Sequence, residues 1–295
     1  MRPAVRAAVV DLLRQAPDDA DRASMMPAGG PDPERTFFLE ASFLEASTWP
    51  DVVRDRDEPQ RRERYRRGHW HYVNHFWAST PDGPLPLSHL DAAEESATER
   101  LLRFAETVAD ASVPGPERAV QRAGMLHLVG DLHQPLHASS RVRPAHPEGD
   151  KGGGSFRLGG EERFGNLHVC WDGILDRSYP RRAGESSVEY ALRLARRLPQ
   201  PDCLDSTATR SGPTRSGPTR SGPTGVAVWT RESAEIAQLA VCLPVLRYLP
   251  VLREGAPPPE ICRRHAPCLS EGRLQLAGLR LAALRMAALL NHLFR

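Results

Sequence analysis

Two pairs of histidine and aspartate, each four residues apart, carry the strongest chemical signal in this sequence. His127 precedes Asp131, and His168 precedes Asp172. In a helix this spacing places both side chains of a pair on one face, with Cβ atoms about 5–6 Å apart. An imidazole and a carboxylate at that separation can hold one divalent cation, as two histidines do in helical zinc proteases. We therefore predict that these residues are metal ligands.

A third histidine, His137, lies between the two pairs and follows Pro135. Proline ends or kinks a helix, so His137 can point back toward the same cavity from another direction. His133 is two residues from Asp131, off the ligand face of a helix, and we interpret it as structural. Ordinary surface or capped core histidines are the simpler alternative, but they leave the repeated pattern unexplained.

Another cluster of histidines occurs in the segment 69–75, where histidines and aromatic residues alternate, and this segment is expected to be extended. In a strand His69, His71 and His75 would share one face, so spacing alone does not choose a ligand among them. Residues 54–67, dense in Arg and Glu, indicate a solvated linker.

The rest of the chain predicts a mainly α fold with little sheet. Helices are expected where apolar residues recur at helical spacing, over 4–14, 36–48, 88–110, 117–132, 187–198, 229–244 and 272–294. The last of these is expected to be a buried terminal helix. Phe156–Leu158 is a short strand candidate, and the glycine-rich residues 150–155 indicate a flexible loop.

Composition limits the class of protein. The chain has 295 residues with 40% hydrophobic content and a net charge of +2, so no strong overall field attracts an anionic partner. Five cysteines without Cys-x-x-Cys spacing argue against a thiolate zinc site. No run of 18 apolar residues predicts a membrane span, and we find no signal peptide in the chain as given. A Ser-Gly-Pro-Thr-Arg repeat predicts a disordered, low-complexity insert at about 206–225.

Several motifs resemble the zinc-dependent, single-strand-specific nucleases of the nuclease S-one and nuclease P-one type. The similar stretches are Trp49–Arg54, His71–Asn74, His127–His137, Asp150–Gly154, Asn166–Asp172 and the C-terminal Leu276–Asn291. The resemblance implies one helical nuclease-like domain over 1–295, interrupted by the insert, with the multinuclear zinc cleft that phospholipase C shares.

The resemblance also assigns ligands by position. The first zinc would be held by Asp51, His71, His127 and Asp131, and the second by His137, His168 and Asp172. The family's third zinc uses an N-terminal Trp, a His five residues later and the carboxylate at Asp131. This sequence has neither that Trp nor that His before Asp51. We expect either a start codon assigned too late, which removes a signal peptide and these ligands, or a degenerate protein; two zinc ions are expected here.

Further roles follow from the same resemblance. Asp131 and Arg54 would be catalytic, Arg54 by neutralising charge on the phosphoryl group. Tyr72 would stack on an unpaired base, and Asn74, which matches a family carboxylate, would bind that base. Gly154 stands where the family has Asn, so a base contact that the family makes would be absent.

The function implied is that of a secreted or periplasmic, monomeric endonuclease and phosphodiesterase of DNA catabolism. It would hydrolyse single-stranded DNA and RNA to 5′-phosphorylated products, with 3′-nucleotidase action as a possible addition. Zinc held by imidazole and carboxylate is strongly Lewis acidic and brings the pKa of bound water toward about 7. The alternatives are a zinc phospholipase C-like phosphodiesterase, whose family has Glu where Asp172 stands, and an inactive zinc-binding remnant.

Overall fold

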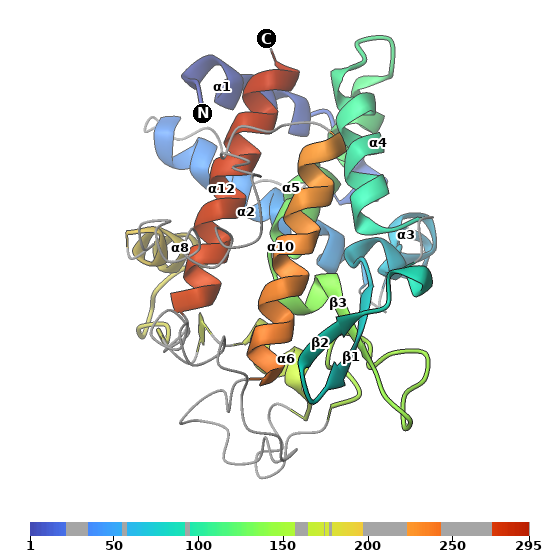
Figure 1. The fold of residues 1–295 in the computed structure, drawn as a ribbon. Helices are drawn as coiled ribbons and strands as arrows, with labels where there is room; N and C mark the ends of the chain where they lie inside the picture. The colour runs from blue at the N-terminus through green and yellow to red at the C-terminus, as the bar shows by residue number, and fades with distance from the viewer. Residues whose placement is uncertain are drawn as a thin grey trace.

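The computed structural model is mainly helical, as the sequence predicts (Figure 1). The residues that it describes are 1–21, 35–54, 58–91, 95–156, 165–173, 175–176, 179–196, 223–242 and 273–294. Helices α10 (Pro223–Cys242) and α12 (Arg273–Leu293) run side by side across the face seen in Figure 1, and a small sheet lies beside the lower half of α10. No helix in these ranges is both long and apolar enough to cross a membrane.

Helix α5 (Gly115–Asp131) is the centre of the packing, with α1, α2, α4 and α12 in contact with it. Its sequence allows this position because small and apolar side chains lie on several of its faces, including Ala119, Ala123, Met125 and Leu128, all buried. Gly124 lets the ring of Phe104 approach closely, since a Cβ there would lie 2.6 Å from that ring. This central helix ends at Asp131 and so delivers both His127 and Asp131 to the candidate site.

Helix α4 (Ala97–Ala109) is shorter than the predicted helix over 88–110. Ser96 caps its N-terminus by accepting a hydrogen bond from the main-chain N–H of Glu99. A separate 3-10 turn, η4 (Ser88–Leu90), precedes it. Asp91 interrupts the predicted helix because its carboxylate accepts hydrogen bonds from the main chain of Phe76 and pairs with the ring of His75.

Helices α1 (Pro3–Leu13) and α2 (Arg35–Val52) confirm two predicted helices, and α2 extends past the predicted end to carry Asp51. The predicted linker over 54–67 is wrong in part, since Pro59–Tyr65 forms helix α3. Pro59 suits the first turn of a helix. Arg64 and Tyr65 bind Asp19, which holds α3 against the 3-10 turn η1 (Asp18–Ala20).

The first part of the segment expected to be extended over 69–75 is instead a 3-10 turn, η3 (Gly68–His71). Strand β1 (His75–Thr80) begins only at its last residue and lies at the centre of a three-stranded sheet of order β2-β1-β3. Strand β2 (Gly83–Pro86) is antiparallel to β1, and β3 (Ser139–Val142) is parallel to it with His75 opposite Ser139. The parallel pairing places the chain after His71 beside the chain after His137.

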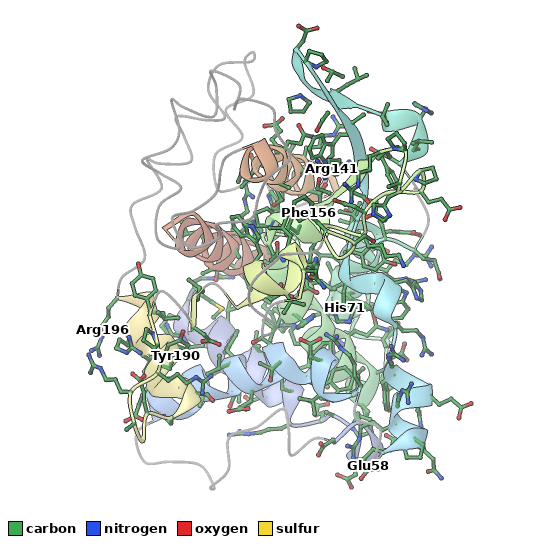
Figure 2. All side chains as sticks on the ribbon, turned by 90° about the horizontal axis from the view of Figure 1, so that it is seen from below. Glu58, His71, Arg141, Phe156, Tyr190 and Arg196 are labelled. Carbon is green, nitrogen blue, oxygen red and sulfur yellow. The ribbon has the colours of Figure 1, made fainter. Side chains whose placement is uncertain are left out.

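Two shorter helices complete the described fold, α6 (Leu167–Asp172) and α8 (Ser187–Ala195), the latter confirming a predicted helix. Figures 1 and 2 place α8 on the side of the molecule opposite the sheet. In Figure 2 His71 lies well inside the outline, whereas Glu58 and Arg196 lie at its periphery.

Some predictions fall outside the described residues. The repeat insert does so up to residue 222, but residues 223–225 form the first turn of α10 instead. That helix therefore begins before the predicted 229 and is described to Cys242. Of the strand candidate at Phe156–Leu158 only Phe156 is described, and it is not in a strand. The apolar helix over 272–294 is confirmed as α12, which buries Leu289 and Leu290.

Candidate metal centre

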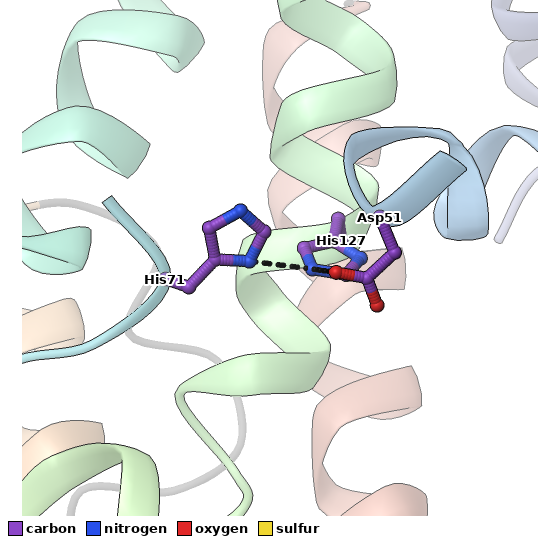
Figure 3. A group of neighbouring side chains, drawn as sticks. All are labelled: Asp51, His71 and His127. Carbon is purple, nitrogen blue, oxygen red and sulfur yellow. Dashed lines mark hydrogen bonds and ion pairs between the residues drawn. The ribbon is translucent and has the colours of Figure 1, made fainter. Parts of the chain in front are cut away.

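Asp51, His71 and His127 form a first group of side chains, from the end of α2, from η3 and from α5 (Figure 3). Nε2 of His127 lies 2.9 Å from Nδ1 of His71 and 3.9 Å from Oδ1 of Asp51. Asp131, one helical turn after His127, places Oδ2 3.0 Å from both ring nitrogens. The four residues predicted for one ion therefore come together from three separate segments.

His137, His168 and Asp172 form a second group. His137 reaches it from η5 (Pro135–Ala138), and the other two side chains project from α6. Oδ1 of Asp172 lies 3.8 Å from Nε2 of His137, and its Oδ2 lies 3.6 Å from Nε2 of His168. The rings of His137 and His168 stack with centroids 4.9 Å apart. The amide of Gln134 donates a hydrogen bond of 2.9 Å to Oδ1 of Asp172 and so orients this carboxylate.

Main-chain carbonyls orient three of the histidines. Nδ1 of His127 lies 2.7 Å from the carbonyl of Ser47, Nδ1 of His137 lies 2.9 Å from that of His71, and Nδ1 of His168 lies 2.9 Å from that of Gly152. A carbonyl can only accept, so each Nδ1 carries a proton, and each Nε2 presents a lone pair when its imidazole is neutral. This second layer of hydrogen bonds is the usual arrangement behind metal-binding histidines.

The donor set of the first group fits a cation. The lone pair of His127 Nε2 faces both the carboxylate of Asp131 and Nδ1 of His71 at about 3 Å. One shared proton cannot satisfy three acceptors that converge from three directions, whereas a divalent ion with nitrogen and oxygen ligands does so. Among the described residues only these two groups of His, Cys, Asp or Glu have this compactness.

Asp131 connects the two groups. Its Oδ2 faces the first group, and its Oδ1 lies 3.5 Å from Nδ1 of His137. Burial opposes its ionisation, but the hydrogen bonds that His127 and His71 donate when the nitrogens facing Asp131 are protonated outweigh burial and hold the pKa of Asp131 well below its usual value. Burial likewise opposes protonation of His127, yet Asp131 raises the pKa of His127, while burial lowers the pKa of His137.

The glycine-rich loop over 150–155 was predicted to be flexible, but hydrogen bonds fix it. Asp150 is buried, and its Oδ1 accepts from the main-chain N–H groups of Arg141 and Gly153. Lys151, Gly152 and Gly153 all have positive φ, between 56° and 78°. This conformation turns the carbonyl of Gly152 toward His168. In the sequence, Asp150 shortly before Gly152 and Gly153 is the pattern that indicates such a turn.

The remaining predicted residues lie at the edge of the two groups. Arg54 forms an ion pair with Asp51, and both are about half exposed. Tyr72 follows His71 in the chain and is 43% exposed. Asn74 is half-buried, and in the described part of the chain the side chains of Tyr72 and Asn74 form no hydrogen bond.

The other histidines are engaged elsewhere. His69 pairs with Glu95, and His75 bridges Asp91 and Thr230, so His71 alone of the three reaches the first group. His133 is buried, with Nδ1 2.7 Å from the carbonyl of Val129 and Nε2 accepting from Arg285. Its burial and the charge of Arg285 lower the pKa of His133 to about 3, which keeps it neutral. That position agrees with a structural residue.

Comparison with known proteins adds an independent finding. A family model described as S1/P1 Nuclease matches residues 11–295, nearly the whole chain, including every residue of both groups. No curated protein is similar enough to match.

Proposed function

Because the chain belongs to the S1/P1 nuclease family, a family of metal-dependent hydrolases acting on phosphoester bonds, we propose that it is a zinc-dependent endonuclease of single-stranded DNA and RNA. The products would carry 5′-phosphates, and 3′-nucleotidase action is part of the same proposal. The observation that carries the proposal is the convergence of unprotonated imidazole nitrogens and carboxylates within a chain of this family. Such ligands, with no thiolate, are typical of catalytic rather than structural zinc.

In this proposal Asp51, His71, His127 and Asp131 hold one zinc ion, and His137, His168 and Asp172 hold another. A pair of such ions supplies Lewis acidity and a clamp on the oxygens of a phosphodiester. Residues of the chain orient these ligands, as the carbonyls of Ser47 and Gly152 do for His127 and His168. The proposal assigns two zinc ions to this chain.

Other residues would act on the substrate directly. The guanidinium of Arg54, beside Asp51, would exchange part of this exposed ion pair for a phosphate oxygen and neutralise charge that develops there. The exposed ring of Tyr72 would stack on a base, and Asn74 would donate to or accept from its edge. A base that is paired and stacked in a duplex is not available to Tyr72, which is the physical reason for expecting single-strand preference.

We also propose that residues 1–295 form one nuclease-like domain, interrupted by the repeat insert, and that the protein acts as a monomer. The family is typically extracellular, so a secreted or periplasmic location is proposed. The core agrees with one domain, since α1 and α12, from opposite ends of the chain, both pack on α5.

The test compares the zinc-supplemented protein on single-stranded DNA, duplex DNA of the same sequence and a phospholipid. We expect hydrolysis of the single strand, with His127→Ala lowering kcat by about 10³-fold because a pair of metals contributes several kcal/mol. The exposed His89 is the matched control, and His89→Ala should retain activity. Hydrolysis of the phospholipid alone would establish the phospholipase alternative, and two bound zinc ions without any hydrolysis would establish the inactive remnant.

A further inference from the structure

A cavity of about 600 Å³ opens beside the first metal group. Its wall follows α5 from Glu117 to Leu128, and α4, η3 and the ends of α2 and α3 enclose it. His71 lines this cavity and also belongs to the first group, so the two spaces are adjacent. The volume is within the range that accommodates small ligands.

The charged residues on the cavity wall are mainly cationic. Four arginines line it, Arg64, Arg67, Arg100 and Arg103, against one acid, Glu117. Three of these arginines pair with acids beyond the wall, Asp19, Glu95 and Glu99; the guanidinium groups of Arg64 and Arg103 are exposed in their pairs, whereas the side chain of Arg100 is mostly buried. Exposed pairs of this kind contribute little free energy, so an anionic ligand can compete with them.

Arg67 is the arginine whose charge is least compensated. Within the described ranges, its guanidinium donates only to the main-chain carbonyls of Glu63 and Arg66, at 3.1 and 2.8 Å, and lies 5.8 Å from the ring centre of Trp70. No carboxylate in those ranges pairs with it. A guanidinium with remaining donors at a cavity wall is suited to bind a phosphate.

Aromatic rings provide a further part of the wall. Trp49 and Tyr65 meet edge to face with centroids 5.6 Å apart, and Trp70 and Phe104 do so at 5.8 Å. Arg100 covers one face of Trp70 at 4.4 Å. Arginine together with aromatic rings is the combination by which proteins bind single-stranded nucleic acid, the cations on the backbone and the rings on the bases.

We propose that this cavity is a second nucleotide subsite, which binds one unit of the strand whose scissile phosphate lies at the metal groups. Arg67 and Arg103 would bind the phosphate, and the ring of Tyr65 would contact the base. Inorganic phosphate would fill only a small part of this volume and leave the rings unused. The inference rests on the proposed function, because it assigns the cavity to the same substrate.

The experiment measures binding of a cleavage-resistant phosphorothioate octanucleotide and of adenosine monophosphate to the zinc-loaded protein. Arg67→Ala should weaken octanucleotide binding about tenfold and lower the slope of log K against log salt by about 0.7, the value for one phosphate contact on a single strand. Arg66→Ala is the matched control, because Arg66 is adjacent and exposed but does not line the cavity. It should bind like the wild type.

A second variant tests the space without removing charge. Thr107→Trp places a large ring in the cavity from α4 and should also weaken binding about tenfold. Weaker binding of adenosine monophosphate as well would identify a site for free nucleotides, and an effect on the octanucleotide alone would identify a site for the strand. Wild-type affinity in both variants would overturn the subsite.

Hydrolysis of a dinucleotide by the wild-type protein distinguishes failure of the subsite from failure of the proposed function. If the wild type hydrolyses the dinucleotide while Arg67→Ala and Thr107→Trp both bind the octanucleotide with wild-type affinity, only the subsite is wrong. If the wild type hydrolyses no phosphodiester, the proposed function is wrong, and the subsite loses its basis with it.

Discussion

Gly152→Ala is the substitution for which the structure gives the most specific expectation. Gly152 has φ +58°, and a Cβ on it would lie 2.2 Å from the carbonyl oxygen of Leu136. Real Cβ contacts are at least about 3.0 Å, so the two must separate by about 0.8 Å. Because the obstacle is main chain rather than a flexible side chain, Gly152 itself has to move.

That movement acts on the second group. The carbonyl of Gly152 accepts the Nδ1 proton of His168 at 2.9 Å, and a shift of about 0.8 Å along this bond would lengthen it to about 3.7 Å, beyond bonding distance. Losing the partner behind a metal-binding histidine lowers metal affinity by about 10- to 100-fold. Left-handed backbone and the contact with Leu136 add an expected loss of about 2 kcal/mol in the free energy of unfolding.

The assay is competition for zinc with a chromophoric chelator, together with thermal unfolding. Gly184→Ala is the control, since Gly184 has φ +77° but no atom within 4 Å of the added Cβ. It should cost about 1 kcal/mol of stability, from backbone strain alone, and retain both zinc ions. Wild-type zinc affinity in Gly152→Ala would refute the claim that the carbonyl of Gly152 orients His168 for metal binding.

Three further predictions concern separate parts of the chain. His168→Ala should lose one zinc ion per chain by metal analysis, whereas His133→Ala should keep both. His133→Ala should lower the free energy of unfolding by about 2–4 kcal/mol, because it leaves a cavity and removes a partner of buried Arg285. Zinc loss in His133→Ala would contradict the ligand assignment. Ser96→Ala should cost about 1 kcal/mol in denaturant unfolding because Ser96 caps α4, and an unchanged midpoint would disprove the cap. Deleting residues 211–222, the part of the repeats that precedes α10, should leave the melting temperature and zinc content unchanged, since a Pro- and Gly-rich repeat buries little; a large drop would show that it is packed.

Local spacing predicted the part of the site that is built within one element. His127 and Asp131 were expected on one face of a helix, and the 3.0 Å between Nε2 and Oδ2 agrees with that expectation. His137 was expected to turn back after Pro135, and η5 turns it toward His168. In both cases the geometry follows from helix periodicity or from proline, which sequence displays directly.

Spacing could not choose among His69, His71 and His75, because their roles depend on partners far along the chain. His69 turns to Glu95, and His75 turns to Asp91 and Thr230. Strand β3 was also missed, since Ser139–Val142 has neither alternating polarity nor a run of apolar residues. Its parallel partner β1 lies some 60 residues earlier, and a local pattern carries no information about such pairing.

Helix α3 shows a different cause of error. Its arginines and glutamate were interpreted as a solvated linker, but Pro59 marks a helix start and Asp19 anchors Arg64 and Tyr65 from another segment. Charge density indicated exposure correctly, since no residue of α3 is buried. It did not exclude helix.

The two hydrogen bonds between the chain at His71 and the chain at His137 have a thermodynamic consequence. Nδ1 of His137 donates to the carbonyl of His71 at 2.9 Å, and the carbonyl of His137 accepts from the N–H of Val73 at 2.8 Å. An ion that immobilises His71 therefore also immobilises the acceptor that orients His137. Occupancy of either group should raise the affinity of the other by the same factor, because linkage between two binding equilibria is reciprocal. In a zinc titration the species with one ion would then be rarer than two independent sites allow.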